Sequence, residues 1–215
     1  MPANSIIVGD PTNPSVLLLS FGKDPCFDDI TKHLMKELKR RAAFHEATTA
    51  EEFTSLIATV TPTAIVVTEA EIAKDKYSAI RAKVVDYAKA GGIVVFCGMF
   101  SGMIRPLKLN DMWLSDWNLP WKSGDYHRTT FRLNPSRTQK LRSITSMPKA
   151  YSMKAVHLDG ATPEAMVYVT TPDWNMEQSP VLFTPIGQGY VGYLGDVNAE
   201  EESTAVVLGL CGLLN

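Results

Sequence analysis

One stretch decides the fold: residues 91–102, which read GGIVVFCGMFSG. A glycine pair precedes an apolar run, Ile93 to Phe96, and two more glycines follow the run at positions 98 and 102. The run does not alternate between apolar and polar residues, which is typical of a strand covered on both faces in a parallel sheet. A sharp turn after such a strand presents side chains and backbone N–H groups at the carboxyl edge of the sheet. We therefore expect a ligand site or a nucleophile at this strand–helix elbow.

Strands and amphipathic helices alternate on the amino-terminal side of this stretch. Apolar runs at 16–20 and 64–67 predict two more buried strands, and 43–47 predicts a short one. Between them, apolar residues recur at helical spacing, and Thr49 with Glu52 forms a capping box. The order predicts an α/β fold: a flavodoxin-like, doubly wound, mostly parallel sheet with helices on both faces.

The pattern changes between residues 103 and 149, where prolines interrupt it and tryptophans stand at 113, 117 and 121. We interpret this part as a Trp-rich insertion, folded over the carboxyl edge of a single domain that spans residues 1–215. The tryptophans either form a small core within the insertion or restrict access to a ligand. Within the insertion only 127–133 alternates like a strand. The remaining segments predict four antiparallel C-terminal strands at 150–158, 165–170, 181–186 and 190–194. A last helix is expected after Asn198, which would cap it.

Composition narrows the class of protein. A net charge of −2 argues against a nucleic-acid partner or a polybasic membrane surface, and 45% hydrophobic residues support a substantial core. No secretory pattern opens the chain and no apolar run approaches the roughly 18 residues of a membrane span. The three cysteines and four histidines are scattered, without disulfide or metal-ligand spacing. We expect a cytoplasmic protein with no cofactor and no metal.

Two places in the chain resemble the class I glutamine amidotransferase-like superfamily, including its trehalose-utilisation-like relatives. They are the helix–strand–elbow unit from Tyr77 to Gly102 and the run GQGYVGYLGD at 187–196. The resemblance covers about two thirds of the chain, without the Trp-rich part, and it implies a homodimer. Active members carry an elbow Gly-x-Cys-x-Gly and a late His-x-Glu pair. Here Phe100 stands at the nucleophile position and Gly195-Asp196-Val197 replaces the pair, so the resemblance implies a degenerate triad without glutaminase activity.

Two classes of function follow from these residues. The first is a pseudoenzyme: a non-catalytic amidotransferase-like domain that binds a small molecule or a protein partner in a cleft at the elbow. The residues expected at this cleft are Cys97, Gly98, Met99, Phe100, Ser101, Glu69, Phe21 and Trp117. The alternative is a small cysteine hydrolase or isomerase with Cys97 as nucleophile, assisted by His127 or His157. An accessory role within a homo-oligomer is a third possibility.

Each candidate also has a purely structural interpretation. Cys97 stands between Val95 and Met99, whereas working elbows need small residues there, so an inert buried thiol is the alternative. Glu69 follows a central strand and either acts as a base or cation ligand, or is an ordinary solvated loop carboxylate. Asp196 is either a functional carboxylate or a turn residue. Cys26 and Cys211 are expected to be packing residues.

Overall fold

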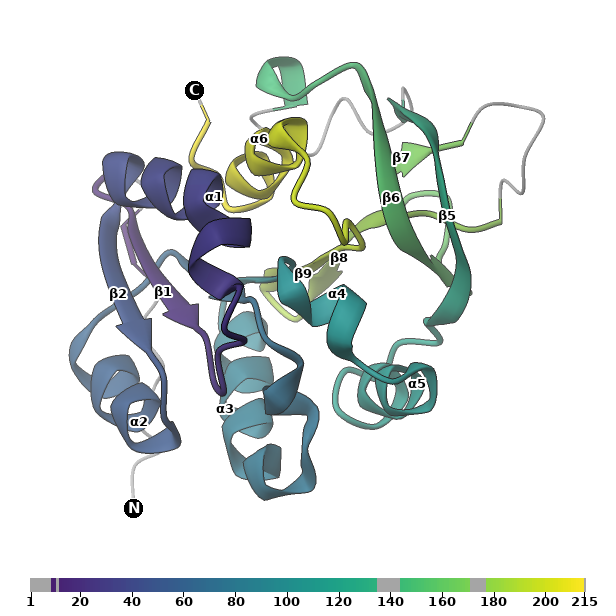
Figure 1. Ribbon diagram of the computed structural model, residues 1–215. Helices are drawn as coiled ribbons and strands as arrows, with labels where there is room; N and C mark the ends of the chain where they lie inside the picture. The colour runs from purple at the N-terminus through teal and green to yellow at the C-terminus, as the bar shows by residue number, and fades with distance from the viewer. Residues whose placement is uncertain (1–8, 11, 135–143, 171–176, 215) are drawn as a thin grey trace.

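The computed structural model describes residues 9–10, 12–134, 144–170 and 177–214. Within them the chain forms one sheet of nine strands in the order β2-β1-β3-β4-β9-β8-β7-β5-β6 (Figure 1). No helix in the described ranges is long and apolar enough to cross a membrane. The sheet divides into a parallel half and an antiparallel half.

The parallel half contains five strands, of which β9 borders the other half. They are β1 (Ser15–Leu19), β2 (Ala43–Ala47), β3 (Ala64–Val67), β4 (Ile93–Phe96) and β9 (Gly189–Leu194). The predicted parallel arrangement of the runs beginning at Val16, Ala64 and Ile93 is confirmed. All four residues of β3 are fully buried. A strand with two covered faces needs apolar residues at every position, which explains the uninterrupted runs.

Helices cover both faces of this half (Figure 1). Successive strand residues point to opposite faces, so each strand contributes to two hydrophobic cores. Leu18, Val66 and Val95 pack in one core with α1 (Phe27–Arg41) and α6 (Glu201–Leu210). Leu17, Ile65 and Val94 pack in the other core with α2 (Ala50–Thr59) and α3 (Ser78–Lys89). The N-cap half of the predicted capping box is present, because the Thr49 hydroxyl accepts the Glu52 N–H at 3.2 Å, whereas the Glu52 carboxylate accepts the N–H of Thr48, one residue before the cap.

The antiparallel half combines the predicted C-terminal strands with a strand from the segment 103–149. Its strands are β5 (Lys122–Leu133), β6 (Ala150–Asp159), β7 (Met166–Val169) and β8 (Val181–Ile186). Together with β9 they pair antiparallel. The expected flavodoxin-like, mostly parallel sheet is therefore wrong, and the architecture is a mixed sheet. One physical reason is the tight turn between β8 and β9, which permits only antiparallel pairing, whereas a parallel pair needs a long crossover.

The segment from 103 to 149 forms part of the main fold. After α4 (Met99–Met103) come α5 (Pro106–Ser115) and β5, and β5 pairs with both β6 and β7. Residues 135–143 lie outside the described ranges. The segment thus supplies one of the longest strands of the sheet, where an insertion over its edge was expected.

The tryptophans of this segment are core residues. Trp113, Trp117 and Trp121 are at most 3% exposed and belong to the core that faces α2 and α3. The Trp113 ring lies edge-on to Phe96 at 5.2 Å and to Tyr193 at 6.1 Å between ring centroids. These ring contacts pack α5 against β4 and β9. The tryptophans are therefore core residues, and the predicted role as a lid is wrong.

The last helix begins two residues later than expected. Its N-cap is Glu200, and the Asp196 carboxylate accepts the N–H groups of Asn198 and Glu200 at 2.9 and 2.8 Å. Asp196 is thus a structural turn residue, and the capping role expected of Asn198 is wrong. Ala199 takes a left-handed φ of 54° in this turn.

Candidate active site at the carboxyl edge

The elbow after β4 has the expected turn, but its candidate reactive residue is buried. Gly98 adopts φ 64° and begins α4, so the chain does turn sharply there. Cys97 and Phe100 are both completely buried, and the Phe100 ring packs against Phe96 with 4.8 Å between centroids. Burial, with smaller contributions from Cys211 and Asp196, raises the pKa of the Cys97 thiol well above its usual value. This is an inert core thiol.

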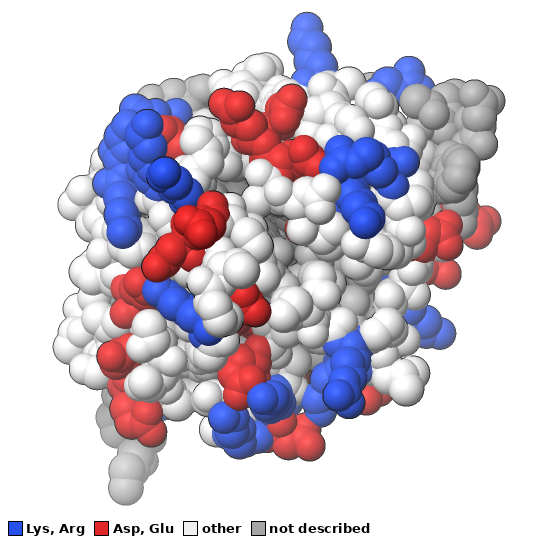
Figure 2. Space-filling model, in the orientation of Figure 1, with Lys and Arg blue, Asp and Glu red and all other residues white. Residues whose placement is uncertain are grey.

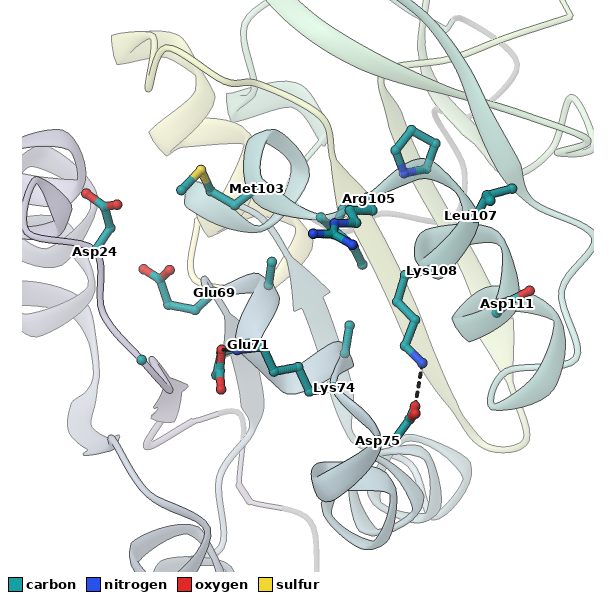
Figure 3. Close-up of a pocket in the computed structure, with 15 residues that line it drawn as sticks. Asp24, Glu69, Glu71, Lys74, Asp75, Met103, Arg105, Leu107, Lys108 and Asp111 are labelled. Atoms are coloured by element: carbon teal, nitrogen blue, oxygen red, sulfur yellow. Dashed lines mark hydrogen bonds and ion pairs between the residues drawn. The ribbon is translucent and has the colours of Figure 1, made fainter.

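An open cleft of about 1110 Å³ lies beside the elbow. Three segments form it: the loop after β1, the loop and 3-10 turn after β3, and the α4–α5 connection (Figure 3). The first two follow the carboxyl ends of parallel strands, where open α/β sheets hold ligands. The cleft is therefore where this architecture places a site, and Cys97 is not among the residues that line it.

Glu69 is the most unusual group in the cleft. It precedes the 3-10 turn Ala70–Ala73, is only 4% exposed, and its Oε1 atom has no hydrogen-bond partner among the described residues. Burial first, then the negative charge of Asp24, raises the pKa of this carboxyl to about 7, against a smaller opposing effect of Lys23. Figure 3 shows its side chain between Asp24 and Met103. Near neutral pH the group can both donate and accept a hydrogen bond.

Most cations of the cleft are already paired. Lys74 and Lys76 form ion pairs with Glu71, and Lys108 pairs with Asp75. These pairs lower the pKa of both carboxyls.

Arg105 differs from these lysines, because it makes no hydrogen bond or ion pair within the described residues. Figure 3 shows its guanidinium extending over the cleft. The charged groups of the cleft that lie outside ion pairs are thus Glu69, Asp24, Asp111 and Arg105, and one oxygen of Asp24 already accepts the Cys26 N–H at 2.8 Å.

The predicted cleft residues separate in space. Glu69 lines the cleft, whereas Phe21 is buried against Tyr77 and Ser101 donates to the Asp196 carbonyl oxygen at 3.1 Å. Gly98 instead borders a pocket of only about 30 Å³ between α1 and α6. Met99 packs at the margin of the core that α1 and α6 cover. The interpretation of Glu69 as a solvated loop carboxylate is wrong, because Glu69 is buried. The expectation that Cys26 is a packing residue is also wrong, because Cys26 is exposed, whereas Cys211 is buried as expected.

The sequence did not single out Asp24 and Arg105. Asp24 follows the first buried strand by a short loop, which is a usable signal. Arg105 precedes Pro106, the first residue of α5, and nothing in its neighbours marks it. On the face drawn in Figure 2, acidic and basic side chains are interspersed, and no extended surface of one sign is present there.

Comparisons with known proteins identify relatives by structure alone. No protein-family model matches the chain, and no curated protein matches its sequence. Among solved structures, a β-galactosidase from Bacillus circulans sp. alkalophilus superimposes with a TM-score of 0.60 and 12% identity over 92% of this chain and 30% of that chain. Gan42B, a GH42 β-galactosidase from G. stearothermophilus, superimposes with a TM-score of 0.58 and 12% identity over 94% of this chain and 30% of that chain. The exo-β-1,4-mannosidase Op5Man5 from Opitutaceae bacterium strain TAV5 superimposes with a TM-score of 0.51 and 11% identity over 92% of this chain and 36% of that chain.

These similarities correct the family inferred from sequence. The neighbours are glycoside hydrolases, so the assignment to the class I glutamine amidotransferase-like superfamily is wrong. The amidotransferase-like binding domain and the cysteine hydrolase alternative are wrong with it. Glycine-bounded apolar strands followed by a turn occur in many α/β folds, so they identify a local unit and no family. At this identity the similarity establishes the fold only, and this chain spans about a third of each neighbour's length.

Proposed function

We propose that this chain is a carbohydrate-binding domain, which holds a saccharide in the cleft formed by the β1 and β3 loops and the α4–α5 connection. The single observation that carries the proposal is Glu69, a nearly buried carboxyl without a partner at the cleft, with a pKa near 7. The names of the structural neighbours, β-galactosidases and a mannosidase, supply the ligand class.

The chemistry of the cleft suits sugar hydroxyls. Each hydroxyl both donates and accepts a hydrogen bond, and a half-protonated carboxyl does the same. Asp24 adds acceptors and Arg105 adds donors, while Met103 and Leu107 offer apolar surface to the C–H face of a ring. The cleft is at the upper end of the volumes typical of ligand sites, so it accommodates an oligosaccharide.

Calorimetric titration with β-galacto- and β-manno-oligosaccharides tests the proposal. We expect the affinity to fall as the pH rises from 6 to 8, because the neutral carboxyl of Glu69 donates a hydrogen bond that the ionised form cannot. Glu69→Gln should keep the affinity and lose the pH dependence, since the amide imitates the neutral acid. Glu69→Ala should weaken binding at least about tenfold, as expected for a buried hydrogen bond.

Glu51→Gln serves as the matched control, because Glu51 is an exposed carboxylate on α2, away from the cleft. This variant should bind like the original chain. Failure of both sugar series to give saturable binding, or an unchanged affinity in Glu69→Ala, would refute the proposal.

Glycoside hydrolysis at the same cleft is a second candidate. It is favoured by one observation, that the charge of Asp24 raises the pKa of Glu69. A carboxyl with a raised pKa beside a second carboxyl group is the pairing that glycosidases use. Glu69 would protonate the glycosidic oxygen, and Asp24 would act as nucleophile or activate water.

Hydrolysis of 4-nitrophenyl β-galactoside and β-mannoside separates the two candidates. If the chain hydrolyses either one, Glu69→Gln should abolish turnover while retaining affinity, and Asp24→Asn should abolish turnover too. Binding without turnover would exclude hydrolysis and leave carbohydrate binding standing.

Two expectations from the sequence remain predictions. A homodimer would be detected by sedimentation at micromolar concentration, with a monomer counting against it. A cytoplasmic location would be checked by fractionation of cells that produce the chain.

A further inference from the structure

The charged side chains of the cleft are separated into an acidic end and a basic end. Figure 3 shows Asp24 and Glu69 at one end, and Arg105 and Lys108 at the other. The acidic end follows the carboxyl ends of β1 and β3, whereas the basic end belongs to the α4–α5 connection and the first turn of α5. A ligand that spans the cleft therefore meets carboxyl groups at one end and cationic donors at the other.

The lysines of the cleft have partners. Lys108 is balanced by Asp75, whereas Glu71 is shared by Lys74 and Lys76, so this second cluster has one positive charge in excess. An anion at the basic end therefore meets ion-pair clusters that are neutral or positive overall, and they do not repel it.

Arg105 is the cation of the basic end that lacks a partner among the described residues. Its backbone is held in place, because its carbonyl oxygen accepts the Leu109 N–H at 3.0 Å and the following Pro106 restricts it to an extended conformation, with ψ at 138°. The unpaired carboxylate of α5, Asp111, lies apart from it (Figure 3). The guanidinium is thus presented to the cleft from a fixed position, with its donors free.

We propose that the saccharide bound in the cleft is acidic and carries a carboxylate, as a uronic acid does, which pairs with Arg105; this assignment rests on the carbohydrate binding proposed above. A guanidinium offers two parallel N–H groups that match the two oxygens of a carboxylate. A neutral sugar uses only the donors of Arg105, whereas a uronate also uses its charge.

The acidic end of the cleft limits where that carboxylate can be. A carboxylate beside Asp24 and Glu69 would meet like charges and a carboxyl that is already poorly solvated, so it would be rejected there. The hydroxyls of a neutral ring suit that end, because Glu69 and Asp24 accept hydrogen bonds from them. The structure therefore favours an oligosaccharide with one acidic terminal residue over one that is acidic throughout.

The test is a calorimetric titration of the full chain at pH 6 with β-linked trisaccharides of the galacto or manno series, whichever neutral trimer binds more tightly. The probes are the neutral trimer, the trimers with C6 of either terminal residue oxidised to a carboxylate, and the trimer oxidised at every residue. We expect one singly oxidised trimer to bind about tenfold more tightly than the neutral trimer, as for a charge-assisted bidentate pair. The fully oxidised trimer should bind less tightly than the singly oxidised one, and salt should reduce the tenfold advantage.

Variants of Arg105 are compared by the ratio of the affinities for the acidic and the neutral trimer. Arg105→Gln should bring this ratio to about one, and Arg105→Lys should retain only part of it, because an ammonium group lacks the planar fork. Arg132→Gln is the matched control and should keep the full ratio, because Arg132 is an exposed arginine on β5 outside the cleft.

Two outcomes separate this assignment from the proposed function. If the neutral trimer binds in a manner that depends on Glu69, but the carboxylate adds no affinity or its advantage survives in Arg105→Gln, the acidic ligand is overturned and carbohydrate binding stands. If no trimer, neutral or acidic, binds saturably, carbohydrate binding itself is refuted and the acidic ligand is refuted with it.

Discussion

The two halves of the sheet follow different rules. In the parallel half, β1, β3 and β4 are buried between helices on both faces, and the candidate cleft opens at the carboxyl ends of β1 and β3. In the antiparallel half, β6 alternates between buried and exposed residues along most of its length. A strand with two covered faces tolerates no polar side chain, whereas a strand with one free face tolerates one at every second position. The comparison teaches that a charged substitution should destabilise the buried parallel half strongly and an exposed position of the antiparallel half only slightly.

The largest expected effect is a charge placed at the centre of the parallel half. Val66 is fully buried in β3, so Val66→Asp would bury an unpaired carboxylate and should destabilise the fold by more than about 4 kcal/mol. Thr130→Asp on the exposed face of β5 should change the free energy of unfolding by about 0.5 kcal/mol or less. Denaturant unfolding followed by circular dichroism measures both, and equal losses would remove the distinction between the halves.

The next effect concerns the seam that α5 makes with β4 and β9. Trp113 is fully buried against Phe96 and Tyr193, so Trp113→Ala should cost about 3–5 kcal/mol. Leu114→Ala is the control on the same helix, because Leu114 is 64% exposed and its truncation should cost about 0.5 kcal/mol or less. A Trp113→Ala variant that keeps full stability but binds ligands faster would restore the lid interpretation.

Glu69 gives the parallel half a stability that falls as pH rises. Its pKa is raised from 4.5 to about 7, so the folded state binds the proton more tightly than the unfolded state. The contribution is complete below pH 4.5 and is lost as the pH rises through 7. Glu69→Gln should therefore be more stable than the original chain by about 1–3 kcal/mol at pH 8, with little difference at pH 4. A difference in the free energy of unfolding between the two chains that stays constant from pH 4 to 8 would contradict this prediction.

His157 gives the antiparallel half the opposite dependence. Its pKa is lowered from 6.5 to about 4, so the unfolded state binds the proton more tightly. Stability from this group is complete above pH 6.5 and is lost as the pH falls through 4. His157→Phe should remove about 1–3 kcal/mol of the acid-induced loss between pH 7 and 4. If His157→Phe loses as much stability between pH 7 and 4 as the original chain, His157 is solvated and the prediction is wrong.

The sequence by itself determined the parallel half almost completely. The strands beginning at Val16, Ala64 and Ile93, the helices between them and the Thr49 cap could all be predicted. Burial on two faces imposes a local composition, and a capping residue acts on an N–H group three positions away, so both signals lie within a few residues. The C-terminal strands were also recognisable from their patterns, although their place in one mixed sheet was not.

Tertiary structure alone decided the rest. The tryptophans are the same residues whether they form a lid or a core, and only the packing against Phe96 of β4 and Tyr193 of β9 shows that they belong to the core. The pKa of Glu69 depends on what surrounds it, and the contact of His127 with His157 depends on the register of a hairpin. The elbow after β4 looked like an active site because its glycines set the backbone, but the packing of Cys97 and Phe100 closed it. Backbone preference depends on the types of neighbouring residues, so it can be predicted from a short stretch of sequence. Burial and proximity depend on contacts between residues far apart in the chain, so they cannot.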